Sequence, residues 1–157
     1  MKSLAGSSPP SLRLEFISLG DELLLGIRPN SHLTYIGKQL AKLGHTIQRN
    51  VVIRDQPADI ERIFNESWEH SDVIITTGGL GPTTDDLTRE TISEIFGLDL
   101  LHDDGVEQTI RERFARIGRE VTENNLRQAK ILDGADVLPN DYGTAPGMWL
   151  CKDGKHL

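Results

Sequence analysis

The sequence predicts an α/β fold with three layers, in which helices cover both faces of a mostly parallel β-sheet. Short apolar runs alternate along the chain with stretches of helical periodicity, and single helices separate successive strands. Strands connected in this way pair in parallel through right-handed crossovers, which places helices on both faces of one sheet. Ligands of such sheets bind beyond the carboxyl ends of the strands, so a functional site is expected there.

The boundaries of the elements follow from the apolar pattern and from capping residues. The expected strands cover residues 14–19, 47–53, 73–77 and 136–138, with a further strand at 148–152. The expected helices and helical pieces cover about residues 30–44, 55–68, 88–97, 104–117 and 122–130.

Length and composition are those of a single globular domain. The chain has 157 residues, 37% of them hydrophobic, and no apolar run approaches the roughly 20 residues of a membrane helix. Residues 1–13 are rich in Ser and Pro, and we expect a disordered arm or an added remnant there, followed by one domain at 14–157. The single cysteine, Cys151, cannot form an internal disulfide, so a cytoplasmic location without membrane attachment is expected.

The net charge of -7 argues against nucleic acid as a partner, because such binding comes largely from Lys and Arg neutralising phosphates. A small anionic ligand is still compatible with an acidic protein. It would need backbone amides and a bridging cation to hold it.

The turn at residues 76–88 lies between an expected buried strand and a helix. Its three glycines allow a close approach of the backbone to a ligand, and the positive end of the following helix favours an oxyanion. The alternative is that the glycines only form a tight turn and that Asp86 or Thr88 caps the helix. The residues expected to bind phosphate or nucleotide here are Thr77, Gly78, Gly79, Gly81 and Thr88.

Acidic side chains accompany this turn. Asp85 and Asp86 would repel a phosphate unless a divalent cation such as Mg²⁺ lay between them. Asp21 and Glu22 follow the first strand, close to the turn in such a sheet, and one of them could be a second metal ligand or a general base for water. We therefore expect Asp86, Asp85 and Asp21 as metal ligands and Asp86, Asp21 and Glu22 as catalytic residues. Alternatively, Asp21 and Glu22 are solvated loop acids.

Two later segments are weaker candidates. Asn125 and Gln128 could present their amides on one helical face, where amides can read a nucleoside or a pterin. A helix cap led by Thr122 would explain Asn125 equally well but leaves Gln128 unexplained. On their own, residues 143–147, which include Thr144, Pro146 and Gly147, predict only a turn. They become candidates for ligand binding only in combination with the other motifs.

Other chemistries lack their sequence signatures. The five histidines show none of the close pairings that zinc sites use, and neither a Gly-x-Ser-x-Gly elbow nor a Gly-Lys-Ser/Thr phosphate loop occurs. Water is therefore the expected nucleophile.

Taken together, four motifs resemble the molybdopterin-binding-like domain of the CinA (competence/damage-inducible protein A) family, over about residues 14–150. The resemblance implies a MoaB/Mog-like fold. It also implies metal-dependent hydrolysis of the pyrophosphate in ADP-ribose-like nucleotides, with Asp86 matching the acid shared across the superfamily, and we expect a homo-oligomer. The motifs are Gly20-Asp21-Glu22, residues 76–88, Glu123-Asn124-Asn125 with Gln128, and residues 143–147.

Departures from the wider pattern refine this expectation. Leu80 and Asp85 stand where the MoaB/Mog-like pattern has Thr and Arg, which disfavours adenylylation of molybdopterin and favours dependence on a metal. The resemblance does not extend to the family's separate nicotinamide-nucleotide amidase domain, which we expect to be absent from these 157 residues. The family pattern also continues into a Gly-Pro-Pro segment followed by Glu-Met, so we expect the ligand site to lack that segment.

Two rival functions remain open at this point. One is a binding module that captures a molybdopterin-like or nucleotide ligand without turnover, because this fold hosts both behaviours. The other is an inert domain that acts only through oligomer contacts.

Overall fold

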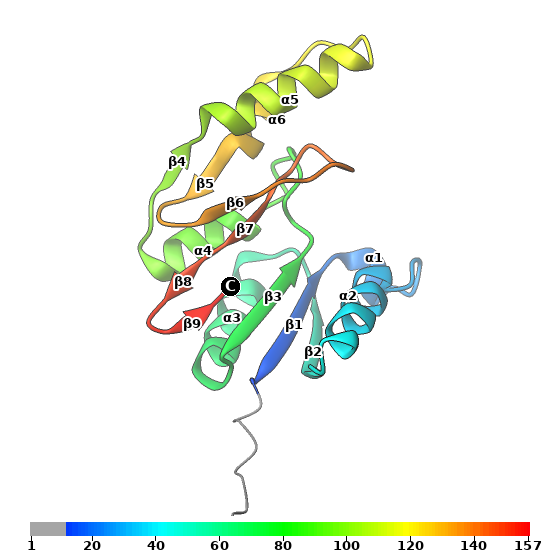
Figure 1. Ribbon diagram of the computed structural model, residues 1–157, viewed down its shortest axis with the longest axis vertical. Coiled ribbons are helices and arrows are strands. Elements are labelled where there is room, and N and C mark those ends of the chain that lie inside the picture. Colours follow the sequence, from blue (N-terminus) through cyan, green and yellow to red (C-terminus); the bar gives the residue numbers. More distant parts are fainter. Residues whose placement is uncertain (1–11) are drawn as a thin grey trace, which may run out of the picture.

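A five-stranded sheet forms the centre of the protein, as the computed structural model of residues 12–157 shows (Figure 1). Four neighbouring strands run parallel and the edge strand β8 is antiparallel, which confirms the mostly parallel sheet. The strands in spatial order are β2 (Ile47–Ile53), β1 (Leu14–Leu19), β3 (Val73–Thr77), β9 (Lys155–His156) and β8 (Cys151–Lys152).

The helices that connect the parallel strands lie on opposite faces of this sheet. Helix α2 (Ser31–Lys42) connects β1 to its neighbour β2, and α3 (Pro57–His70) returns from β2 past β1 to β3. Two right-handed crossovers in opposite directions place their helices on different faces. In Figure 1, α2 lies in front of β2, whereas α3 and α4 (Thr88–Phe96) lie behind the sheet.

The main hydrophobic core lies between the sheet and the helices α3 and α4. All six residues of β1 are buried, as expected for a central parallel strand that is covered on both faces. Phe64 and Trp68 of α3 stack with ring centroids 5.8 Å apart, and Phe96 of α4 meets both rings edge-on. Helix α2 buries no residue completely, so the opposite face of the sheet is less densely covered.

A smaller apolar cluster lies under helix α5 (Asp104–Arg116). Val106 and Ile110 of α5 pack there against Ala129 and Ile131. The remaining elements of this region are β4 (Leu100–His102), α6 (Glu123–Leu126), the 3-10 helix η1 (Arg127–Ala129), β5 (Lys130–Leu132), and the hairpin of β6 (Asp136–Leu138) and β7 (Gly147–Trp149).

Several short elements differ from the sequence-based expectation. The antiparallel pair β4–β5 and the single-turn helix α1 (Asp21–Leu24) were not predicted, and the strand expected at 148–152 is divided into β7 and β8. Strands of two or three residues are too short for an alternating pattern to be visible. Between residues 12 and 157, no helix is both long and apolar enough to cross a lipid bilayer.

The amino-terminal arm expected at residues 1–13 lies almost entirely outside the described residues. Arg13 is described, and it is bound to Asp72. Its amide donates to Asp72 Oδ2 (2.9 Å), and its guanidinium Nη2 lies 2.6 Å from Asp72 Oδ1. The ordered structure therefore includes a residue that was assigned to the arm.

This ion pair gives a pH-dependent prediction. Hydrogen bonds from Arg13 lower the pKa of Asp72 to about 2 from its ordinary value of 3.8. A carboxyl group whose pKa is lower in the folded than in the unfolded protein stabilises the fold fully at pH values above its unfolded pKa. That stability is lost as the pH falls from 3.8 toward 2. In thermal melts, Arg13→Gln should be less stable than the wild type at pH 7, and the difference should shrink by pH 2.5.

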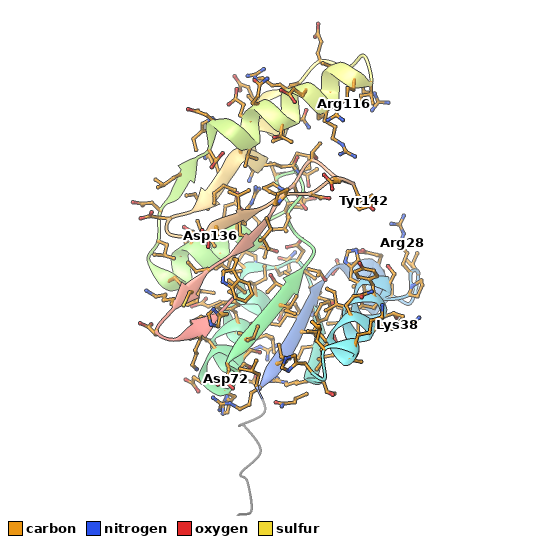
Figure 2. All side chains as sticks on the ribbon, in the orientation of Figure 1. Arg28, Lys38, Asp72, Arg116, Asp136 and Tyr142 are labelled. Carbon is orange, nitrogen blue, oxygen red and sulfur yellow. The ribbon has the colours of Figure 1, made fainter. Side chains whose placement is uncertain are left out.

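The matched control is Arg28→Gln, which removes a charge from an exposed loop at the other end of the sheet from Asp72 (Figure 2). It should show no such pH-dependent difference. An Arg13→Gln deficit of the same size at both pH values would contradict the assignment to Asp72.

Candidate functional site

The turn between β3 and α4 lies in close contact with the residues around it. Gly78 has φ +100° and Gly79 has φ +61°, both in the left-handed region that favours glycine. A Cβ on Gly78 would lie 2.1 Å from the Leu19 carbonyl oxygen, and one on Gly79 would lie 2.1 Å from Thr88 Oγ1. These two glycines are thus required by the tight turn itself. Whether their amides also cradle a ligand stays a prediction.

Thr88 holds the turn to the start of α4. Its hydroxyl donates to the Gly78 carbonyl (3.0 Å) and its amide to the Gly79 carbonyl (3.2 Å), and the side chain is buried. The N-cap of α4 is Leu87, with no side-chain capping bond, so the alternative in which Asp86 or Thr88 is the cap is wrong. Thr88 supports the turn from inside the protein.

Asp86 is held in one orientation by its own turn. The Thr83 amide donates to Asp86 Oδ2 (2.9 Å), and the Thr83 hydroxyl donates to the same oxygen. Burial alone would raise the pKa of Asp86, but the bonds from Thr83 and the amide of Gly81 outweigh it, and the pKa is lowered. Asp86 is therefore a fixed, ionised carboxylate.

Asp55, which follows β2, belongs to the same acidic group and was missed as a site residue. Its carboxylate oxygens lie 2.9 and 3.0 Å from the place of a Cβ on Gly79, and its Oδ1 is buried with no hydrogen-bond partner in residues 12–157. Burial raises the pKa of Asp55, the Leu87 amide opposes this, and the charges of Asp86, Asp21 and Asp85 raise it further.

Strand register explains why these acids meet. In the parallel ladder, Leu19 pairs with Ile53 and Ser18 pairs with Thr77, so β1, β2 and β3 end at the same edge of the sheet. The residues just past each end then share that edge. Asp55 had been interpreted only as the start of a helix, but the alignment of the three strand ends could have identified it.

The charges of Asp21, Asp85 and Asp86 all act on Asp55, but these acids do not form a complete coordination shell. Across the described part of the chain, no three His, Cys, Asp or Glu side chains are arranged to hold a metal ion. Asp21 and Asp85 are exposed, whereas Asp86 is fixed by Thr83. The expected divalent ion, with Asp86, Asp85 and Asp21 as ligands, stays a prediction.

A polar cavity of about 160 Å³ adjoins this edge. Thr77, Gly78 and Glu22 line it, together with Arg28 from the segment between α1 and α2 and His32 from the first turn of α2. Figure 2 shows Arg28 extending from that segment beyond the carboxyl end of β1. This cavity is the place where an anionic group could meet both the turn and a positive charge.

The side chains of Asn125 and Gln128 each make a hydrogen bond within the protein, although Gln128 Oε1 is buried with no partner among residues 12–157. Asn125 Oδ1 accepts from the Thr122 amide (3.0 Å), and the Thr122 hydroxyl accepts from the Asn125 amide (3.4 Å), so the two form a capping box. Gln128 is 2% exposed and donates from Nε2 to the Leu80 carbonyl (3.1 Å). The cap interpretation thus holds for Asn125, and Gln128 contacts the turn from behind instead of lining its surface.

Thr144 and Pro146 lie apart from the acids. They line a cavity of about 280 Å³ between the β6–β7 loop and the start of α5, and no residue of the 76–88 turn lines it. Gly147 pairs with Leu138 in the hairpin. The structure therefore does not bring these three residues into the cavity beside the turn.

Comparisons with known proteins agree with this geometry. The profile of the family described as "Probable molybdopterin binding domain" matches residues 15–156. A "Putative competence-damage inducible protein" of Bacillus cereus (strain ATCC 10987 / NRS 248) is 42% identical over 144 residues, and one of Bacillus anthracis is equally similar. The structure of "the protein CinA with unknown function from Thermoplasma acidophilum" matches with a TM-score of 0.82 and 32% identity, over 93% of this chain and 85% of that one.

The chain belongs to the CinA family. It corresponds to the amino-terminal, MoaB/Mog-like domain. The match covers 92% of this chain but 35% of each Bacillus relative, so the chain spans about a third of their length. A tungsten cofactor synthesizing protein MoaB from Pyrococcus furiosus matches with a TM-score of 0.55 and 18% identity, over 96% of this chain and 80% of that one, which supports the fold alone.

In this CinA domain, the two residues that depart from the MoaB/Mog-like pattern lie in different surroundings. Asp85 is exposed and accepts a bond from the Thr84 hydroxyl (3.2 Å). Leu80 instead lines an apolar cavity of about 260 Å³ beside β3, together with the buried Arg89. The substitution at position 85 thus adds a carboxylate to the acidic edge, whereas the half-buried Leu80 adds apolar surface to that cavity.

The crowding of acids in the CinA domain predicts a stabilising substitution. Asp55→Asn removes a partly buried charge that faces three other acids and keeps an oxygen for the Leu87 amide. We expect the free energy of unfolding to rise by about 1 kcal/mol and the melting temperature by about 3 °C. Thermal melts without divalent ions would measure this.

Asp136→Asn on β6 is the control, because the same change there lies outside the acidic edge. It should leave the melting temperature nearly unchanged. A lower melting temperature for Asp55→Asn would show that Asp55 is a favourable part of the fold.

Proposed function

We propose that this CinA domain is a metal-dependent nucleotide pyrophosphatase that acts on ADP-ribose-like substrates with water as the nucleophile. The observation that carries the proposal is the grouping of Asp21, Asp85 and Asp86 around Asp55 at the edge of the sheet where Thr77 and Gly78 line the polar cavity. The acids follow three strand ends, and Arg28 lines the cavity together with Thr77 and Gly78. Isolated structural acids would be expected to avoid one another, because like charges at close range are unfavourable.

The donor set fits a hard divalent cation such as Mg²⁺. All four side chains are carboxylates, and Asp55 has a buried oxygen with no partner among the described residues. Mg²⁺ binds through one or two carboxylates together with phosphate oxygens and waters, so a few fixed acids suffice. When bound, the ion would neutralise phosphate charge and lower the pKa of a coordinated water.

The chain itself would supply orientation and charge. The Thr83 bonds favour the ionised Asp86 carboxylate and fix its orientation, and this carboxylate would be one ligand of the cation. Glu22, which lines the polar cavity, would accept a proton from water, and Asp21 on α1 would be the alternative base. Thr77 and Gly78 would contact a phosphate there, and Arg28 would attract it to the cavity.

The decisive experiment is hydrolysis of ADP-ribose by the purified chain with and without Mg²⁺. The proposal expects release of AMP and ribose 5-phosphate that requires the ion and is lost in Asp86→Ala. Full turnover by a folded Asp86→Ala, or equal turnover in the presence of a chelator, would overturn this mechanism.

The second candidate is a module that binds a nucleotide or a molybdopterin-like ligand without turnover. The family description as a molybdopterin binding domain and the incomplete coordination shell favour it. Calorimetry that detects tight ADP-ribose binding with no product would support this function. The inert-domain alternative predicts that no nucleotide raises the melting temperature.

A further inference from the structure

The turn that carries Asp86 is held from behind by a segment that is remote in the sequence. Gln128 Nε2 donates to the Leu80 carbonyl (3.1 Å), and Arg127 Nη1 donates to the Thr83 carbonyl (3.0 Å). These two carbonyls lie on either side of Gly81. The 3-10 helix η1 therefore contacts the turn at two points, more than forty residues along the chain from it.

The contact with Leu80 reaches Asp86 through a single peptide group. The Leu80 carbonyl and the Gly81 amide belong to one planar trans peptide and point in opposite directions. A Cβ on Gly81 would lie 2.4 Å from Asp86 Oδ2, and the Gly81 amide is among the donors that favour the ionised carboxylate. When Gln128 holds the carbonyl, it also directs the amide toward Asp86.

The contact with Thr83 acts on the other side of the carboxylate. Thr83 donates to Asp86 from both its amide and its hydroxyl, and its own carbonyl is the acceptor for Arg127. Fixing the Thr83 backbone therefore limits where Asp86 Oδ2 can lie.

Helix α4 completes this arrangement. Arg127 Nη2 also donates to Glu90 Oε1 (3.0 Å), and Arg89 Nη1 donates to the Arg127 carbonyl (3.1 Å). Arg89 and Gln128 are each 2% exposed, so water cannot readily replace these bonds. The turn, α4 and η1 are thus joined by four bonds, which we call the brace. Its members are Arg89, Glu90, Arg127 and Gln128.

We propose that Arg127 and Gln128 are positioning residues, which fix the turn so that Asp86 is presented to the divalent cation in one orientation. This inference rests on the proposed function for the role of the cation. It also changes the role expected for Gln128 from contact with a nucleoside to support of the turn.

The test is Gln128→Met, which keeps the length of the side chain and removes the donor. In the folded variant, we expect amide hydrogen exchange at Gly81 and Thr83 to become about tenfold faster. We also expect the dissociation constant for Mn²⁺, measured by electron paramagnetic resonance, to rise about tenfold, as is typical when a residue that orients a metal ligand is removed. Gln108→Met, on the exposed face of α5, should change neither quantity.

Arg127→Lys distinguishes positioning from simple loss of charge. Lys keeps the positive charge but cannot bridge Thr83 and Glu90 with a planar fork, so faster exchange at Thr83 is expected in spite of the retained charge. Unchanged exchange at Gly81 and Thr83 in both folded variants would overturn the proposal that the brace fixes the turn.

Failure of this inference can be separated from failure of the proposed function. If the wild type neither binds Mn²⁺ nor hydrolyses ADP-ribose, the metal-dependent function and the role assigned to the cation fall together. If the wild type binds Mn²⁺ and Gln128→Met binds it equally well, the proposed function stands and the positioning role is refuted.

Discussion

Asp86→Asn is expected to lower the rate of ADP-ribose hydrolysis by about 100-fold or more, because a neutral amide is a poor ligand for Mg²⁺. The same variant should remain folded. Its amide oxygen can still accept the bonds from the Thr83 amide and hydroxyl, and one charge is removed from a crowded group of acids. Because the lowered pKa of Asp86 means that folding favours its ionised form, we expect a melting temperature slightly below that of the wild type, together with the loss of turnover.

This combination makes the result interpretable. Initial rates at saturating Mg²⁺ and melting curves of the same preparations would measure both effects, with Asp136→Asn as the matched control. If Asp86→Asn kept full turnover, the acidic edge would not be the catalytic centre. If it lost turnover only because it unfolded, the assigned role of Thr83 in fixing residue 86 would be incorrect.

Gly78→Ala is expected to cost the largest amount of stability among single substitutions in the turn. Alanine at φ +100° is strained, and its Cβ would lie 2.1 Å from the Leu19 carbonyl oxygen, so the backbone of β1 or of the turn must move. We expect a loss of about 3 kcal/mol in the free energy of unfolding, which is about 10 °C in melting temperature.

Gly134→Ala separates the two causes. Gly134 also has a positive φ, +78°, but no atom lies within 4 Å of a Cβ built there. Its substitution should cost only the conformational strain, about 1 kcal/mol. Equal losses in chemical denaturation of the two variants would show that the close approach to Leu19 is unimportant.

The parts of the fold that sequence predicted correctly have strong local signals. The central strand β1 is largely apolar, apart from Glu15 and Ser18, because both of its faces are buried, and α3 begins at Pro57, a favourable first residue of a helix. The strands β4 and β5 have three residues each and are defined by pairing with each other. Nothing within three residues indicates a partner that lies thirty positions away.

In the candidate site, too, residues with a local sequence signal were predicted, and residues defined by contacts distant in the sequence were not. The glycines and acids of the 76–88 turn were recognisable because they are close together in the sequence. Asp55 was not recognised, because its relation to Asp86 depends on the alignment of β2 with β1 and β3. Gln128 has a polar side chain whose partner is a backbone carbonyl, and no residue type marks such an acceptor in a sequence.

The alignment of the three strand ends also limits where the protein can tolerate inserted or deleted residues. One residue inserted within β1, β2 or β3 would move the acid that follows that strand by about 3.3 Å and turn the intervening side chains to the other face. An insertion in the loop between β6 and β7 would leave all three ends in place. Deletions and insertions should therefore be rare in these strands and common in that loop, even in relatives that share little of their sequence.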